Sequence, residues 1–190
     1  MGKVVIIEGC DRTGKDSLIE KLITNANTYV VCHAGIPKSS NLCSYYYDGI
    51  IHDTLKYYYN KTDLIIHNRS MYGEYVYGPK YRNESKEKVA ELINKLEVGQ
   101  LKTFICENEL YLILLTSSNV DLIYNNRDRL SISDKKEDLE YEFNAFNEIF
   151  EKSIIKNKKK IFVNNGDKFR DKEDIYKDVL NFINNDLKES

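Results

Sequence analysis

The stretch KVVIIEGCDRTGKDSLIEKLITN, residues 3–25, decides the fold. Its first six residues are largely β-branched and apolar without alternation, which is typical of a strand buried on both faces of a parallel sheet. A loop with two glycines follows, and Leu18, Ile19, Leu22 and Ile23 then recur at helical spacing. The stretch therefore predicts a strand, a glycine loop and a helix, which is half of a βαβ unit.

The glycine loop GCDRTGKDS, residues 9–17, nearly matches the phosphate-binding pattern G-x-x-x-x-G-K-[ST]. Such a loop needs glycines so that backbone N–H groups can face phosphate oxygens, and a lysine that reaches the outer phosphates. The helix that follows adds a dipole that favours negative charge. The residues predicted to bind the phosphates of a nucleotide donor are Gly9, Asp11, Arg12, Thr13, Gly14, Lys15, Asp16 and Ser17.

Asp16 stands where the pattern has the hydroxyl that holds magnesium. Mg²⁺ prefers hard oxygen ligands and keeps several waters, so a carboxylate could hold it directly or through water. Alternatively, Asp16 is only an acid favoured by the helix dipole, with Ser17 as the hydroxyl or with the metal held elsewhere. A third interpretation is that binding is retained and catalysis is lost. Asp16 and Ser17 are the candidate magnesium ligands.

Apolar runs and amphipathic helices alternate along the rest of the chain, which predicts a mainly parallel sheet with helices on both faces. Together with the phosphate loop, this pattern predicts an α/β P-loop NTPase fold, a three-layer sandwich with about five strands. The further predicted strands are TYVVCHA, DLIIH, LYLILLT and KKIFVNN, and the further predicted helices are residues 44–60, 86–101, 137–154 and 172–187.

Length and composition predict a single domain over residues 1–190. The 28 basic and 30 acidic residues leave a formal net charge of -2, so nucleic acid is not expected as a partner. Four widely spaced cysteines without a C-x-x-C pair fit reduced thiols in a cytoplasm, that of the host cell if the source is viral. We expect neither a signal peptide nor a membrane-spanning segment.

Two motifs together resemble the thymidylate kinase family. IIEGCDRTGK, residues 6–15, is similar to the family's strand-EG-x-D-x-x-GK opening. DLIIHNRSMYGEYVYGPKYR, residues 63–82, resembles its strand and Asp-Arg segment, in the version of bacteriophage thymidylate kinase-like proteins. The resemblance spans most of the chain and is strong at these two motifs. It implies a kinase with ATP as phosphoryl donor and Mg²⁺ as cofactor, and a homodimer.

The resemblance also implies roles for individual residues. Asp11 would contact the deoxyribose side of the acceptor, and Arg69 would grip the acceptor phosphate. The family has a lid over the donor phosphates, which corresponds here to about residues 125–138. The residues implied for catalysis are Lys15, Arg12, Arg69, Arg127 and Arg129. Those implied for acceptor binding are Asp11, Arg69, Tyr72, Tyr77, Tyr81 and Arg82.

Asn68 is a second departure from the family, because it stands where the family has an aspartate before Arg69. An amide can form hydrogen bonds, but it cannot supply a charge to magnesium or act as a base. We therefore hypothesise that Asp16 compensates for the carboxylate lost at position 68.

Tyrosines, histidines and prolines outside the motifs have simpler interpretations. The YYY runs at residues 45–47 and 57–59 favour packing over base stacking. His33, with Gly35, could line an acceptor cleft, but no histidine has a second ligand at metal spacing. Pro37, and Pro79 within the second motif, both lie in segments that follow predicted strands, and these segments are candidate site loops.

The residues after the second predicted strand favour one kind of acceptor. A sugar hydroxyl needs a carboxylate base, whereas a nucleoside monophosphate already offers an ionised oxygen. Residues 30–42 contain no acid, where deoxynucleoside kinases have a glutamate. The missing acid therefore favours a monophosphate kinase, and the resemblance implies an ATP-dependent deoxynucleoside monophosphate kinase for dTMP or a related or modified pyrimidine deoxynucleotide. The alternatives are a phage-type kinase acting on a DNA 5′ end or a modified base, and a catalytically weak nucleotide-binding regulatory protein.

Overall fold

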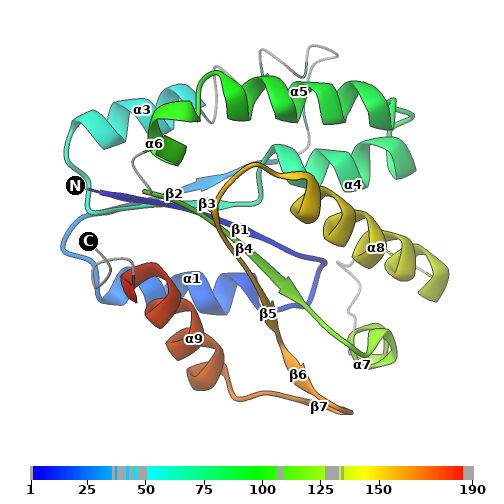
Figure 1. Ribbon diagram of the computed structural model, residues 1–190. Helices are drawn as coiled ribbons and strands as arrows, with labels where there is room; N and C mark the ends of the chain where they lie inside the picture. The colour runs from blue at the N-terminus through cyan, green and yellow to red at the C-terminus, as the bar shows by residue number, and fades with distance from the viewer. Residues whose placement is uncertain are drawn as a thin grey trace.

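A five-stranded parallel sheet forms the centre of the computed structural model, which describes residues 2–35, 37, 42, 45–46, 51–106, 109–126, 133 and 135–185. The strands lie in the order β2-β3-β1-β4-β5, and every neighbouring pair is parallel (Figure 1). Their bounds are β1 Lys3–Glu8, β2 Tyr29–His33, β3 Leu64–Asn68, β4 Leu110–Thr116 and β5 Asn157–Phe162. The five predicted strands and the predicted fold class are confirmed.

The three inner strands are the most apolar runs of the sequence. Val5 of β1 pairs with Ile66 of β3 on one side and with Tyr111 of β4 on the other, and all three side chains are buried. A strand covered on both faces has no reason to alternate polar and apolar residues. The edge strand β2 is more exposed than these three.

Helices cover both faces of the sheet and complete the three-layer sandwich (Figure 1). On one face α1 packs against α9, and on the other α4 packs against both α5 and α8. The bounds of these five are α1 Lys15–Thr24, α4 Met71–Tyr81, α5 Lys86–Val98, α8 Lys136–Lys152 and α9 Lys172–Asn185. Three shorter helices are α3 His52–Tyr59, α6 Lys102–Cys106 and α7 Val120–Asn125.

The carboxyl ends of the parallel strands bring three connecting segments together. Residues 9–14 follow β1, Ala34 and Gly35 follow β2, and Arg69 follows β3. Because β3 pairs with both β1 and β2, these segments lie side by side. Ligands of open α/β sheets bind in the crevice beyond such strand ends.

The segment after β3 lines the second cavity, but it is a helix and not the loop that was expected around Pro79. α4 begins after Ser70, whose side chain accepts a hydrogen bond from the backbone nitrogen of Tyr72, and it contains Pro79 in its last turn. Its residues 71–78 are all buried. A helix that is buried on all sides lacks the 3.6-residue apolar spacing by which a sequence predicts a helix.

Other parts of the chain differ from the prediction in smaller ways. The helices α6 and α7 were not predicted. α3 forms the second half of the helix expected over residues 44–60, and most of the first half lies outside the described residues. Half of the predicted lid, about residues 125–138, lies outside the described residues, including positions 127–132. Among the residues that the structure describes, no helix is long and apolar enough to cross a membrane.

Candidate active site

The loop between β1 and α1 has a backbone conformation that requires glycine at two positions. Gly9 has a φ of 146° and Gly14 a φ of 86°, in the region that L side chains rarely adopt. A Cβ on Gly9 would also lie 2.4 Å from the carbonyl oxygen of Leu115 in β4. Gly14 directly precedes α1, so the unpaired N–H groups of the first helical turn begin at this loop.

The Lys15 side chain folds back over the loop. Its Nζ donates hydrogen bonds to the carbonyl oxygens of Gly9 and Cys10, at 2.7 and 2.8 Å. Thr13 Oγ1 donates to the same Cys10 oxygen at 2.8 Å. Burial lowers the pKa of Lys15, and the positive charge of Arg69 lowers it further. A phosphate in the loop would give this buried ammonium a partner of opposite charge.

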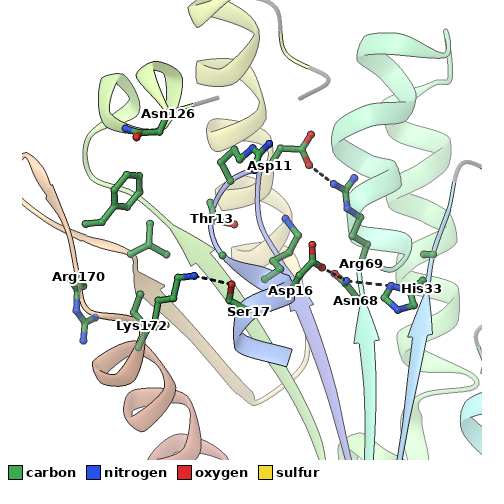
Figure 2. A pocket seen from close by; sticks show the side chains of 17 residues that line it. Asp11, Thr13, Asp16, Ser17, His33, Asn68, Arg69, Asn126, Arg170 and Lys172 are labelled. Carbon is green, nitrogen blue, oxygen red and sulfur yellow. Dashed lines mark hydrogen bonds and ion pairs between the residues drawn. The ribbon is translucent and has the colours of Figure 1, made fainter. Parts of the chain in front are cut away.

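A cavity of about 720 Å³ opens at the loop (Figure 2). This volume lies within the range of small-molecule sites, about 300–1,000 Å³. Its lining residues are Asp11, Arg12, Thr13, Gly14, Lys15, Asp16, Ser17, His33, Ala34, Asn68, Arg69, Asn126, Val163, Phe169, Arg170, Lys172 and Ile175. The structure therefore brings every predicted donor-phosphate residue except Gly9 to one cavity.

Two arginines reach this cavity from left-handed backbone conformations. φ is 68° at Arg12 and 69° at Arg69, which is uncommon for residues that carry a Cβ. Such conformations cost about 1–3 kcal/mol each and concentrate at ligand sites. Arg69 donates a hydrogen bond to Asp11 (Figure 2), and its guanidinium lies 5.4 Å from the centre of the Tyr77 ring. Arg12, Lys15 and Arg69 thus bring positive charge to one place.

Asp16 and Asn68, the two departures from the family pattern, are in direct contact (Figure 2). Asn68 Nδ2 donates a hydrogen bond to Asp16 Oδ1 at 2.7 Å and lies 3.3 Å from His33 Nδ1. Because an ionised carboxylate only accepts hydrogen bonds, the Asn68 atom that faces Asp16 is the amide nitrogen. Positions 16 and 68 are therefore physically coupled.

Oxygen atoms suited to magnesium lie at this side of the cavity. Asp16 offers a carboxylate, and Asn68 Oδ1 is buried without a hydrogen-bond partner among the described residues. Ser17 instead accepts a hydrogen bond from Lys172 Nζ at 3.1 Å. The described part of the chain contains no group of three or more His, Cys, Asp or Glu side chains that could hold a metal. A cation here would need phosphate oxygens as further ligands, as Mg²⁺ usually does at nucleotide sites.

A second cavity, of about 270 Å³, adjoins the first, because Ala34 and Arg69 line both. Its other lining residues are Gly35, Tyr46, Ser70, Gly73, Glu74, Tyr77 and Arg82. The buried Glu74 carboxylate accepts hydrogen bonds from Arg82 Nη2 at 2.6 Å, Arg82 Nε at 3.2 Å and the Tyr46 hydroxyl at 3.1 Å. These three side chains hold one another in place on the cavity wall.

Of the three tyrosines of α4 that were predicted to bind the acceptor, Tyr77 and Tyr81 stack on each other on one face of the helix, and Tyr72 lies on another face. Tyr77 lines the second cavity, and its buried hydroxyl has no hydrogen-bond partner among the described residues. Tyr72 lies away from both cavities and donates to Glu97 at 2.6 Å, so we assign it to packing. Tyr81 also lines neither cavity, and it donates to Glu142 at 2.7 Å. Successive helical residues turn by 100°, so one helix cannot aim all three rings at one place.

The far side of the first cavity was not predicted from the sequence. Val163, Phe169, Arg170, Lys172 and Ile175 line it, from the end of β5 to the start of α9. This connection contains a short hairpin of β6 Asn164–Asn165 and β7 Lys168–Phe169. Its two-residue turn, Gly166-Asp167, is a hairpin signal that the sequence did offer.

The predicted lid is described only in part. Asn126 at the end of α7 lines the first cavity, whereas Arg127 and Arg129 lie outside the described residues.

Glu8 is buried and accepts a hydrogen bond from Ser70 Oγ at 2.8 Å. Burial raises the pKa of Glu8 to about 7, although the Ser70 hydrogen bond and the charge of Lys15 act in the opposite direction.

The strand order, the glycine loop and the cavity at the carboxyl ends of the strands define the class of fold. The chain has the P-loop kinase fold, in the form of the thymidylate and deoxynucleoside kinases.

Particular solved structures share this fold. The YorR protein of Bacillus subtilis, solved with phosphorylated GDP, is 16% identical with a TM-score of 0.64, and the match covers 99% of both chains. Thymidylate kinase of Candida albicans is 12% identical with a TM-score of 0.66, over 98% of this chain and 92% of that one. Deoxyadenosine kinase of M. mycoides with bound dATP is 14% identical with a TM-score of 0.57, over 95% and 98%. No protein-family model and no curated protein matches the sequence.

Proposed function

We propose that this protein transfers the γ-phosphoryl group of ATP to a deoxynucleoside monophosphate. The observation that carries the proposal is that two cavities meet at Arg69, and that the larger one contains the phosphate loop. This arrangement offers one place for the donor and one for the acceptor, with the two phosphate groups beside Arg69. We propose dTMP or a related or modified pyrimidine deoxynucleotide as acceptor, because both motifs resemble those of thymidylate kinases.

In the proposed step, a phosphate oxygen of the acceptor attacks the γ-phosphorus of ATP. A new P–O bond forms while the bond to the β-phosphate oxygen breaks, so ADP leaves with that electron pair and the acceptor becomes a diphosphate. Lys15, Arg12 and Arg69 offset the negative charge of the transferring group. Magnesium, when bound beside Asp16, supplies further charge neutralisation.

The acceptor side favours a monophosphate over a nucleoside. Ala34 and Gly35 follow β2, and neither can serve as a base for a sugar hydroxyl. The carboxylate of Glu74 is engaged by Arg82, and that of Asp11 by Arg69. A monophosphate, with a second pKa of about 6, is already ionised at neutral pH and needs no such base.

The similar structures support the kinase class without selecting one acceptor. They include thymidylate kinases, a deoxyadenosine kinase and a polyphosphate kinase. The experiment that tests the proposal incubates the purified protein with ATP and Mg²⁺ and offers one acceptor at a time. The acceptors are each deoxynucleoside monophosphate, each deoxynucleoside and a DNA oligonucleotide, and products are separated by chromatography.

We expect a diphosphate product with a pyrimidine monophosphate, and no phosphorylated nucleoside or DNA. Labelled DNA would support a kinase acting on DNA instead, and ATP binding without any product would support a regulatory protein. A homodimer, implied by the family resemblance, belongs to the proposal and can be tested by sedimentation at several protein concentrations.

A further inference from the structure

We propose that the carboxylate that serves magnesium has moved from the end of β3 to the start of α1, where Asp16 supplies it and Asn68 holds it in place. This inference rests on the proposed function, since the ion would be bound together with the phosphates of ATP. Asn68 is then a positioning residue: its neutral amide orients Asp16 and does not replace a carboxylate ligand of the metal.

The Asn68 side chain is in direct contact with Asp16. Asn68 is 6% exposed, and its Nδ2 lies 2.7 Å from Asp16 Oδ1. The amide nitrogen can donate two hydrogen bonds, and the second faces His33 Nδ1 at 3.3 Å. Asn68 therefore connects the start of α1 to the end of β2, and it fixes one oxygen of the Asp16 carboxylate.

The side-chain oxygen of Asn68 has hydrogen-bonding capacity that no described residue uses. Asn68 Oδ1 is buried and has no hydrogen-bond partner among the described residues, and Asp16 is exposed at the wall of the cavity. A buried acceptor without a donor is uncommon and calls for an unseen partner. Metal-bound waters are donors, and a carboxylate oxygen is a hard ligand of the kind that Mg²⁺ prefers.

The chemistry of the pair explains why the two departures occur together. Two carboxylates at the Asp16–Asn68 distance of 2.7 Å would repel each other when no cation is bound. An amide at position 68 converts this repulsion into a hydrogen bond. The negative charge of Asp16 is retained for the metal, and the Asn68 amide positions the Asp16 carboxylate.

The other acid and the hydroxyl of the loop have different partners. The Asp11 carboxylate accepts a hydrogen bond from Arg69, and Ser17 Oγ accepts one from Lys172. Of the loop residues 11–17, Asp16 is therefore the acid best placed to receive a cation.

Calorimetry with the non-hydrolysable β,γ-imido analogue of ATP tests the inference without any turnover. The affinity is measured with Mg²⁺ and with EDTA, and the ratio of the two values reports the coupling between metal and nucleotide. The variants are Asp16→Ser, Asn68→Asp, their combination, and Glu20→Ser as a control that removes a charge from an exposed position one turn along α1.

We expect Asp16→Ser to reduce the ratio at least about tenfold and Glu20→Ser to leave it unchanged. Added to Asp16→Ser, Asn68→Asp should restore at least half of the lost coupling, whereas in the wild-type background it should add little. The inference would be overturned if Asn68→Asp changed the affinity ratio equally in the wild-type and Asp16→Ser backgrounds. It would also be overturned if Asp16→Ser alone left the ratio unchanged. If the wild-type protein binds the analogue neither with nor without Mg²⁺, the proposed function itself fails, and this result is distinguishable from the others.

Discussion

At the scale of single residues, Gly9 is fixed both by its backbone conformation and by the approach of β4. A Cβ at this position would meet the Leu115 carbonyl oxygen at 2.4 Å, whereas a Cβ at Gly166, also at positive φ, would meet nothing within 4 Å. We therefore expect Gly9→Ala to lower the free energy of unfolding by at least about 3 kcal/mol, and the control Gly166→Ala by about 1 kcal/mol. Urea denaturation measures both, and equal losses would contradict the role assigned to Leu115.

Glu8 gives a prediction about pH. Its pKa is raised by burial from 4.5 to about 7, so protonation stabilises the fold fully below pH 4.5, and this stability is lost as the pH rises to about 7. Glu8→Gln mimics the protonated form. Its stability relative to wild type should therefore increase between pH 4.5 and pH 8, by on the order of 3 kcal/mol.

The measurement for Glu8 is urea denaturation at pH 4.5 and pH 8, without nucleotide or metal. Glu20→Gln serves as the control, because Glu20 is an exposed carboxylate on α1. A stability difference between Glu8→Gln and wild type that does not change with pH would show that Glu8 is not held protonated by the fold.

At the scale of elements, α4 serves packing with one face and the site with another. The Tyr72 hydroxyl donates to Glu97, whereas the buried Tyr77 hydroxyl has no partner among the described residues and lies at the second cavity. We expect Tyr72→Phe to cost roughly 1–2 kcal/mol of unfolding free energy, and Tyr77→Phe close to nothing.

The kinetic effects of the same two variants should be the reverse. Tyr77→Phe should raise KM for the acceptor by about two- to tenfold, because a hydrogen bond to the acceptor is worth about 0.5–1.5 kcal/mol. Tyr72→Phe should leave this KM unchanged. If Tyr72→Phe raised the KM while Tyr77→Phe did not, the two faces of α4 would be assigned the wrong way round.

Elements also show what the sequence could predict and what it could not. β1, β3 and β4 were predictable because strands covered on both faces are continuous apolar runs. The phosphate loop was predictable because its glycines and lysine lie in one short stretch. α4 was not, because a helix buried all round has no polar face to give it a period, and it contains Gly73, Gly78 and Pro79.

The rest of the site depends on contacts between distant segments. Phe169 and Arg170 reach the first cavity from residues more than 150 positions beyond the loop. The contact of Asn68 with Asp16 depends on the pairing of β1 with β3. The phosphate-loop pattern identified Asp16 as unusual and the family resemblance identified Asn68, but only the folded sheet brings them together.

At the scale of the whole molecule, Arg69 joins the two cavities and should act mainly on the acceptor. We expect Arg69→Ala to lower kcat/KM for the acceptor by about 100- to 1,000-fold, because a positioned charge beside the transferring phosphoryl group is lost. Binding of the ATP analogue in the absence of acceptor should change much less. Lys95→Ala, on α5, is the matched control for the loss of a cation.

If Arg69→Ala weakened binding of the ATP analogue as much as it lowered kcat/KM for the acceptor, Arg69 would be assigned to donor binding instead of acceptor binding. Full activity of the variant would contradict the claim that the two cavities function together.

In the proposed reaction, the loop places ATP so that its γ-phosphoryl group passes to a deoxynucleoside monophosphate in the adjoining cavity. The most direct measurement follows label from γ-³²P-ATP into dTMP and the other pyrimidine monophosphates, with wild type and Lys15→Ala side by side. We predict labelled diphosphate from wild type and a rate at least about 100-fold lower from Lys15→Ala, because Lys15 stabilises the transferring charge. Absence of labelled diphosphate with every monophosphate, or an unchanged rate in Lys15→Ala, would contradict the account.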